Sequence, residues 1–206
     1  MTQRSSWILL ILAGLLAALA GFGLSRKLDS SGPQLASGTW LPAPRAVGDF
    51  HLTDHLGQPF TAQNLQGKVS LVFFGFTHCP DVCPTTLAKL AQVRKVAAVP
   101  ALQVLFVTVD PERDTPTAMG LYVHAFDPEF IGLTGDTQEI QRLSAKFGIA
   151  ATRVELPGGD YTMDHSAAVF LLDRQGRIAA IFTPPFDIQR FALDLHQSLP
   201  YLGSRS

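Results

Sequence analysis

The sequence predicts an α/β fold in which helices flank a central mixed sheet. Three largely apolar runs have the length and composition of strands buried on both faces, at residues 69–74, 102–109 and 165–172. Amphipathic helical patterns alternate with these runs along the chain, at residues 85–96, 114–125 and 136–147. Buried strands that alternate with helices indicate a sheet lying between layers of helix.

Shorter elements complete the predicted domain. Residues 50–53 and 59–61 are expected to form a hairpin that turns at Leu56-Gly57-Gln58. Asp114 or Thr115 is expected to cap the helix that follows, because both side chains can accept a hydrogen bond from its first turn. The other expected elements are a strand at residues 130–133, a polar excursion at 152–164, a hairpin strand at 178–182 and a closing helix at 187–199.

Length and composition fit one domain preceded by a hydrophobic segment. The chain has 206 residues, a formal net charge of −1 and 47% hydrophobic residues. Lys and Arg are scattered without a basic stripe, so we expect no nucleic acid among its partners. Two cysteines are too few for a disulfide scaffold. The pair is therefore either one structural bridge or a working site.

Residues 1–25 are predicted to be a membrane anchor. The stretch from Trp7 to Leu24 carries no charge and is about as long as the shortest segments that span a bilayer, roughly 17–25 residues. A cleaved signal peptide is the alternative, because Ala18-Leu19-Ala20 offers a small-residue cleavage site. Residues 26–45, rich in Ser, Gly and Pro, are predicted to be a flexible tether, and residues 46–203 the folded domain.

The cysteines of CPDVCP stand at the end of the first buried run and before a helical pattern. If the helix begins inside this loop, the spacing of Cys79 and Cys83 puts both sulfurs on one side. The helix N-terminus is then expected to favour the thiolate form. Two such sulfurs can form a disulfide or hold a soft metal ion.

Three motifs, CPDVCP, VDPERDTP and DHSAAVFLLD, resemble those of the Sco/SenC family of copper proteins, and the resemblance runs from about Pro42 to Leu199. It implies a thioredoxin-like fold, usually with a single N-terminal transmembrane helix. It also implies a role in assembling the binuclear copper site of cytochrome c oxidase. On this resemblance, copper is the expected metal and its ligands are Cys79, Cys83 and His165.

The resemblance further implies a metallochaperone rather than an enzyme. Its expected partners are the copper-bearing subunit of cytochrome c oxidase, an upstream copper donor and a thiol reductant. The expected location is the cell inner membrane, with a single span and the soluble domain on the periplasmic side. The residue types suit copper, because Cu(I) is satisfied by two thiolates and Cu(II) gains from an imidazole nitrogen.

Alternative functions remain open at this point. The first is a membrane-anchored thiol-disulfide oxidoreductase that reduces cysteines of a copper-site partner. Its motif would usually have two residues between the cysteines, whereas this loop has three. The second is a peroxidase of the thioredoxin superfamily, for which the sequence offers no clear peroxide-activating group.

Individual residues also have plainer interpretations. The cysteines would form a simple bridge, and His165 would be a hydrogen-bonded core residue. Asp164 either orients the imidazole or belongs to the turn that enters the strand. The charged loop of residues 110–114 either binds a hard cation or consists of capping and solvated ion pairs.

Overall fold

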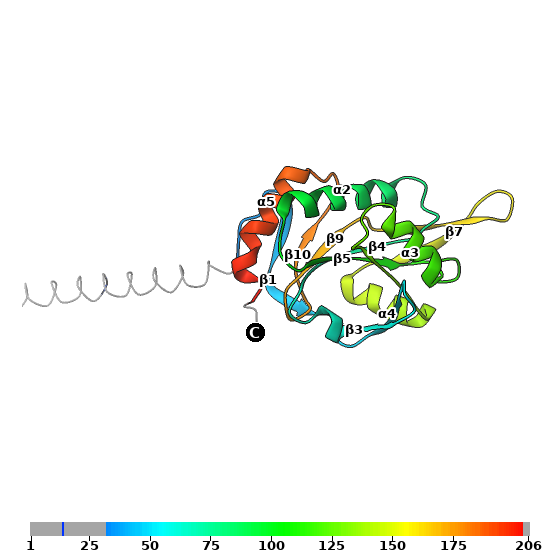
Figure 1. Cartoon of the computed structure of the whole chain (residues 1–206), viewed down its shortest axis with the longest axis horizontal. Helices are drawn as coiled ribbons and strands as arrows, with labels where there is room; N and C mark the ends of the chain where they lie inside the picture. Colours follow the sequence, from blue (N-terminus) through cyan, green and yellow to red (C-terminus); the bar gives the residue numbers. More distant parts are fainter. Residues whose placement is uncertain (1–13, 15–31, 204–206) are drawn as a thin grey trace, which may run out of the picture. The chain divides into compact units, whose positions relative to one another are not determined.

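A computed structural model of the chain describes residue 14 and residues 32–203 (Figure 1). The predicted anchor, apart from Gly14, and the first part of the predicted tether lie outside the described residues. No helix within the described residues combines the length and the apolar character needed to cross a bilayer. The unit that begins at Pro33 is the domain described below.

A mixed sheet of eight strands forms the centre of this domain, in the order β1-β10-β9-β4-β5-β6-β2-β3. Strands β4, β5 and β6 are parallel, and the other neighbours pair antiparallel. Every residue of β4 and β5 is buried, as the uninterrupted apolar runs predicted. The strands are β1 Gly38–Ala46, β2 His51–Asp54, β3 Pro59–Thr61, β4 Val69–Gly75, β5 Leu102–Thr108, β6 Ile131–Thr134, β9 Val169–Leu172 and β10 Arg177–Phe182.

Helices cover both faces of the sheet. On one face, Phe106 of β5 packs between Phe73 of β4 and Tyr122, with ring centroids 5.8 and 5.5 Å apart. On the other face, Phe147 contacts both Phe74 and Phe170, each at 5.0 Å. Tyr122 belongs to α3 and Phe147 to α4, so these helices lie on opposite faces, and α2 and α5 lie beside each other in Figure 1. The helices are α2 Val82–Ala97, α3 Pro116–His124, α4 Thr137–Phe147 and α5 Ile188–Ser198.

The predicted helix starts are confirmed. Thr115 caps α3 by accepting a hydrogen bond from the N–H of Ala118 at 3.3 Å. Asp136 caps α4 by accepting from the N–H of Gln138 at 2.8 Å. Helix α2 begins at Val82, which lies within the CPDVC loop. Cys83 therefore lies in the first turn of α2, and Cys79 lies three residues before the helix begins.

The segment around His165 differs from the prediction. The expected strand over residues 165–172 is two elements, because β8 (Tyr161–His165) ends at the histidine and β9 begins at Val169. The polar excursion before it is a hairpin of β7 (Ala151–Glu155) and β8, which projects from the domain in Figure 1. All residues of β7 are exposed, so no apolar alternation marked it as a strand.

Residues 38–45 also depart from the predicted tether. They form most of β1, an edge strand that pairs antiparallel with β10. Just before it, the buried carboxylate of Asp194 in α5 accepts hydrogen bonds from Ala36 N at 2.8 Å, Ser37 N at 2.7 Å and Ser37 Oγ at 2.6 Å. Backbone pairing and this carboxylate hold the segment, which a reading of its Ser, Gly and Pro content did not anticipate.

The substitution Asp194→Ala is expected to lower the free energy of unfolding by about 2–4 kcal/mol, because it leaves three donors without their acceptor. Urea denaturation of the two proteins measures the difference. Asp49→Ala, which changes an exposed aspartate, serves as the control and should stay within about 0.5 kcal/mol of the original protein. Equal losses in both variants would contradict the role given to Asp194.

Candidate metal centre

Strand β4 delivers the two cysteines to one edge of the sheet. The chain turns after Gly75, and the N–H of Cys79 donates to the carbonyl of Phe76 at 3.2 Å. Cys79 is partly buried, Cys83 is buried, and both are free thiols. The N–H of Cys83 donates to the sulfur of Cys79 at 3.4 Å. The structure therefore brings the two predicted cysteines together at the start of α2.

The predicted histidine reaches the same place from the end of β8. Nε2 of His165 lies 3.6 Å from the sulfur of Cys83. Nδ1 of the same ring is 3.0 Å from the carbonyl oxygen of Ser166. Because a carbonyl oxygen only accepts, Nδ1 carries the proton and donates this bond. The lone pair of Nε2 therefore faces the sulfur, and the thiol donates to it.

The surroundings of His165 are aromatic. The ring lies against Phe73 and Phe76, with centroids 6.4 and 5.8 Å away. Burial lowers the pKa of His165, while the carbonyl of Ser166 and the charge of Asp164 oppose the shift. The carbonyl of Ser166 takes the Nδ1 hydrogen bond, whereas the exposed Asp164 acts on the ring through its charge. The hydrogen bond that orients the imidazole is therefore accepted by the Ser166 carbonyl and not by Asp164.

The expected preference for thiolate is wrong for Cys83. Burial raises the pKa of the Cys83 thiol, and this outweighs the opposing hydrogen bond from the backbone of Phe76. The cost of placing a charge in an apolar environment is larger here than the benefit of the helix N-terminus. Cys83 is therefore protonated at neutral pH, and a metal ion that binds there must displace the proton.

Gly75 allows Cys83 to approach the sheet. A Cβ atom at this position would lie 2.8 Å from the Cys83 sulfur and 2.6 Å from Cε2 of Phe106. Both distances are shorter than real contacts of a Cβ atom. The absence of a side chain at the end of β4 is thus a condition for the position of the buried thiol.

A buried carboxylate holds the loop between β4 and α2. Asp114 accepts hydrogen bonds from the hydroxyl of Thr77 and from the hydroxyl of Thr108, each at 2.6 Å, and from the N–H of Thr77 at 3.1 Å. Its side chain is fully buried. Neither a hard-cation site nor a solvated ion pair describes this residue. Sequence reasoning missed its role because the contact with Thr77 joins residues 37 positions apart.

A second set of contacts docks the hairpin that carries His165. Buried Asp110 accepts from Nε of Arg113 at 2.5 Å and from the hydroxyl of Tyr161 at 2.9 Å. The guanidinium of Arg113 lies 3.7 Å from the centre of the Tyr161 ring and donates to the Tyr161 carbonyl at 3.0 Å. The loop after β5 thus holds β8 four residues before the histidine.

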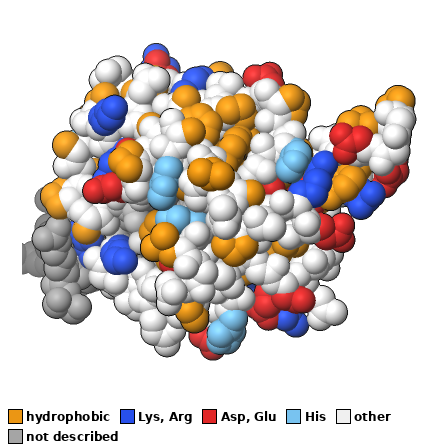
Figure 2. Space-filling view, turned by 45° about the vertical axis from the view of Figure 1, so that its right-hand side comes forward, with side chains coloured by type: hydrophobic (Ala, Val, Ile, Leu, Met, Phe, Trp, Pro, Cys, Tyr) orange, Lys and Arg blue, Asp and Glu red, His pale blue; other side chains and the backbone are white. Residues whose placement is uncertain are grey.

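Around the docked Tyr161, the hairpin presents charges of both signs side by side (Figure 2). The Nε atom of Arg153 donates to Glu155 at 2.7 Å, and the guanidinium lies 3.7 Å from the carboxylate of Glu112. Its guanidinium also stacks on the Tyr161 ring, 3.6 Å from the ring centre. These exposed pairs add little stability individually, but they surround the tyrosine that docks the hairpin.

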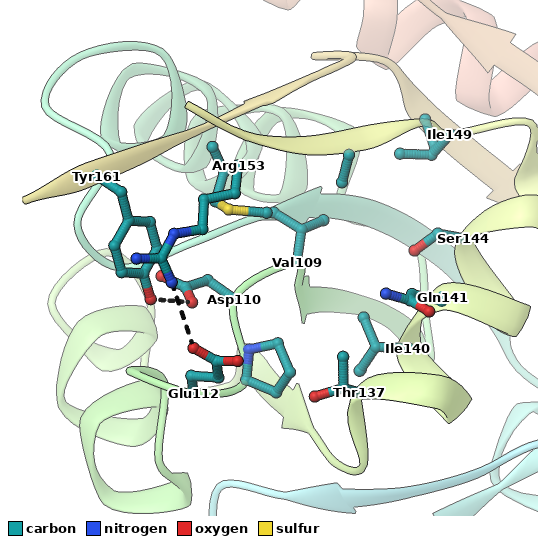
Figure 3. A pocket seen from close by; sticks show the side chains of 13 residues that line it. Val109, Asp110, Glu112, Thr137, Ile140, Gln141, Ser144, Ile149, Arg153 and Tyr161 are labelled. Atoms are coloured by element: carbon teal, nitrogen blue, oxygen red, sulfur yellow. Dashed lines mark hydrogen bonds and ion pairs between the residues drawn. The ribbon is translucent and has the colours of Figure 1, made fainter. Parts of the chain in front are cut away.

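A cavity of about 260 Å³ lies between the loop that follows β5, helix α4 and the β7–β8 hairpin (Figure 3). Arg153 and Tyr161 stand on one side of it, and Gln141 and Ser144 of α4 face them. Its lining includes neither cysteine nor His165. The cavity is therefore separate from the predicted metal ligands.

The three predicted ligands are neighbours rather than a closed coordination shell. Among the described residues, no three His, Cys, Asp or Glu side chains already surround a point suited to a metal ion. Metal bonds to sulfur and nitrogen measure only about 2.0–2.3 Å. The contact of 3.6 Å between Cys83 and His165 would need only small side-chain movements to admit an ion between them.

Comparison with known proteins finds relatives of this sequence in one family. The SCO1/SenC family pattern matches residues 40–199. A putative copper-binding protein of Stutzerimonas stutzeri is 35% identical over 203 residues, which covers 96% of both chains. The SCO2-like protein RC0895 of Rickettsia conorii is 42% identical over 134 residues, 63% of this chain. That match spans 65% of the Rickettsia protein, slightly less than two thirds of its length.

The fold agrees with a solved structure of yeast Sco1 with copper bound. The TM-score is 0.70 at 34% identity, over 76% of this chain and 90% of the yeast chain. This likeness confirms the predicted thioredoxin-like α/β fold.

The substitution Gly75→Ala is expected to lower the free energy of unfolding by about 1–3 kcal/mol, because Cys83 and Phe106 must both move. Gly120→Ala is the matched control, since a Cβ there would meet His55 at an ordinary 3.4 Å. Alanine inside helix α3 should be neutral or stabilising by up to about 1 kcal/mol. Thermal unfolding compares the variants, and a Gly75→Ala protein as stable as Gly120→Ala would contradict the packing argument.

Tyr161→Phe removes one hydroxyl that docks the hairpin and leaves Asp110 paired with Arg113 alone. We expect faster amide hydrogen exchange in residues 151–165, with the exchange of β4 and β5 unchanged. Tyr201→Phe is the control, because this tyrosine is half exposed and lies far along the chain from the hairpin. Unaltered hairpin exchange in Tyr161→Phe would show that the hydroxyl contributes nothing to docking.

Proposed function

The chain belongs to the SCO1/SenC family, and from this premise we propose that it binds one copper ion through Cys79, Cys83 and His165 and delivers it to another protein. One observation carries the proposal. The lone pair of His165 Nε2 faces the sulfur of Cys83 at 3.6 Å, although the two residues are 82 positions apart in the sequence. This contact brings two of the three predicted ligands together from distant parts of the chain.

The donor set suits copper in both oxidation states. Two thiolates satisfy the soft Cu(I) ion, and the imidazole adds a nitrogen that stabilises Cu(II). The carbonyl of Ser166 holds the Nδ1 proton, so Nε2 is free to coordinate without a change of tautomer. Phe73 and Phe76 limit the access of water around the ring.

The proposed site is also suited to release of its cargo. Cys79 remains partly accessible, and the ligands sit at the edge of the sheet on a loop, a helix start and a hairpin. Binding must displace thiol protons, so copper affinity is expected to fall as the pH falls. A carrier with few ligands and an accessible sulfur can pass copper to a partner that offers more ligands.

The family resemblance supplies the proposed destination. We propose that the recipient is the binuclear copper site in the copper-bearing subunit of cytochrome c oxidase. An upstream copper donor and a thiol reductant would load the protein and keep its cysteines reduced. Its proposed location is the cell inner membrane, with the domain on the periplasmic side and residues 1–25 as the anchor. In this role the protein is a metallochaperone and catalyses no turnover.

A second candidate is a thiol-disulfide reductase, which the unequal exposure of the cysteines favours. The accessible Cys79 would attack a partner disulfide as a thiolate and form a mixed disulfide. The Cys83 thiolate would then attack Cys79, which releases the partner as a dithiol and leaves this protein oxidised. The raised pKa of Cys83 slows that second step. The exchange also gives no part to His165, which lies against Cys83, so the copper function is preferred.

Copper titration of the full chain tests the proposal. The original protein should bind one Cu(I) per chain, and Cys83→Ser should lose that binding because a single thiolate remains. His165→Ala should retain Cu(I) but bind Cu(II) at least about tenfold more weakly, with a changed absorption spectrum. His51→Ala, an exposed histidine on β2, is the control.

Unchanged stoichiometry and spectrum in Cys83→Ser would exclude the proposed copper site. Insulin reduction at a useful rate, equal in the original protein and in His165→Ala, would instead favour the reductase. The two functions therefore differ in their need for the histidine.

A further inference from the structure

The cavity between the loop that follows β5, helix α4 and the β7–β8 hairpin has the features of a binding site. The apolar part of its lining consists mainly of Val109, Ile140, Ile149 and Met163. The side chain of Ser144 is only 4% exposed, and its hydroxyl oxygen has no hydrogen-bond partner among the described residues. Figure 3 shows this residue facing Arg153 and Tyr161 across the cavity. Buried hydroxyls usually have a partner, and a polar group that entered the cavity would supply one.

The charges of the lining are balanced, which favours an uncharged occupant. Asp110 is paired with Arg113 at 2.5 Å, and the guanidinium of Arg153 lies 3.7 Å from the carboxylate of Glu112. A charged ligand would have to displace one of these partners or leave water without a partner of its own. The other polar side chains of the lining are neutral. Among them, the amide of Gln141 offers both a donor and an acceptor, which are the groups that a peptide bond needs.

The size and the position of the cavity indicate a peptide rather than a larger ligand. Its volume of about 260 Å³ lies below the roughly 300–1,000 Å³ that is usual for sites of drug-sized molecules. Two residues of its lining, Ala151 and Arg153, belong to β7, which pairs with β8 alone among the described strands. The other edge of β7 therefore presents backbone groups without a strand partner in this part of the chain. Such an edge can pair with an extended segment of another protein.

We propose that an extended, uncharged segment of a partner protein pairs with the free edge of β7 and places one apolar side chain in the cavity. Alternate side chains of an added strand point to the same face of the hairpin as Ala151 and Arg153, and this face lines the cavity. The apolar side chain would contact the apolar part of the lining. Ser144 and Gln141 would form hydrogen bonds with the peptide groups on either side of it.

This position holds the partner beside the proposed copper site. In the register of the hairpin, Ala151 lies directly opposite His165. Neighbouring strands are about 4.8 Å apart, so a strand added to β7 would lie about 10 Å from the backbone of β8, which carries the histidine. The partner is the protein that receives copper, and on this point the inference rests on the function proposed above.

A peptide titration tests the site. The probe is the uncharged peptide acetyl-Ala-Leu-Ala-amide, which is added to the original full chain while amide chemical shifts are recorded. Saturable shifts are expected in residues 140–144 and 151–155. Ala151→Trp places a large side chain in the cavity and should weaken binding at least about tenfold. Thr152→Trp is the matched control, because this exposed neighbour lies on the opposite face of β7, outside the lining, and should leave binding unchanged.

A smaller change tests the hydrogen bonds to the peptide. Gln141→Ala removes the side-chain amide and should weaken binding of the probe about three- to tenfold. Gln138→Ala is the control, since Gln138 is an exposed glutamine of the same helix that does not line the cavity. Equal affinities in these two variants would contradict the role given to Gln141.

The outcomes separate this inference from the proposed function. No saturable binding, an equal loss in both tryptophan variants, or tighter binding of acetyl-Ala-Lys-Ala-amide would overturn the site. Each variant should still bind one Cu(I) per chain, and transfer of copper to the copper-bearing subunit should slow at least about tenfold in Ala151→Trp alone. Unchanged transfer in a variant that no longer binds the peptide would overturn the assignment of the partner. If the original chain binds the peptide but no copper, the proposed function fails and the site stands.

Discussion

The carboxylate of Asp114 is the constraint on which the arrangement of the site depends. Parallel strands β4 and β5 end at the same edge of the sheet, and the loops that leave them contain Thr77 and Asp114. Bonds from Thr77 and Thr108 to one buried carboxylate fasten these loops to each other. A buried anion with fewer donors would be costly, so the loops are held in the one arrangement that satisfies it. The start of α2, and with it Cys83, follows from that arrangement.

The same loop after β5 also fixes the third predicted ligand. Asp110 and Arg113 bind Tyr161, and the short β8 strand carries this constraint to His165. One polar loop therefore positions both the cysteine helix and the histidine hairpin. The docking contacts hold Tyr161, which follows directly after the turn at residues 156–160, so they fix the end of β8 opposite to the histidine.

Burial gives the site its chemical character. Cys83 lies against Gly75 and is kept neutral by the apolar surroundings, while Cys79 remains partly accessible. A metal ion that replaced the thiol proton would balance the negative charge of the buried thiolate.

The sequence by itself determined the buried strands β4 and β5, the helices α2 to α5 and the position of the cysteines at a helix start, because each depends on local periodicity, capping and spacing. The tertiary structure alone decided the rest. The hairpin of β7 and β8 has no buried face to mark it, and β1 is held by pairing with a strand more than a hundred residues away. The protonation of Cys83 depends on how deeply its side chain is buried. The contact between Cys83 and His165 depends on interactions between loops that are distant in the sequence. Such contacts leave no periodic signal, since the residues that make them are adjacent only after the chain has folded.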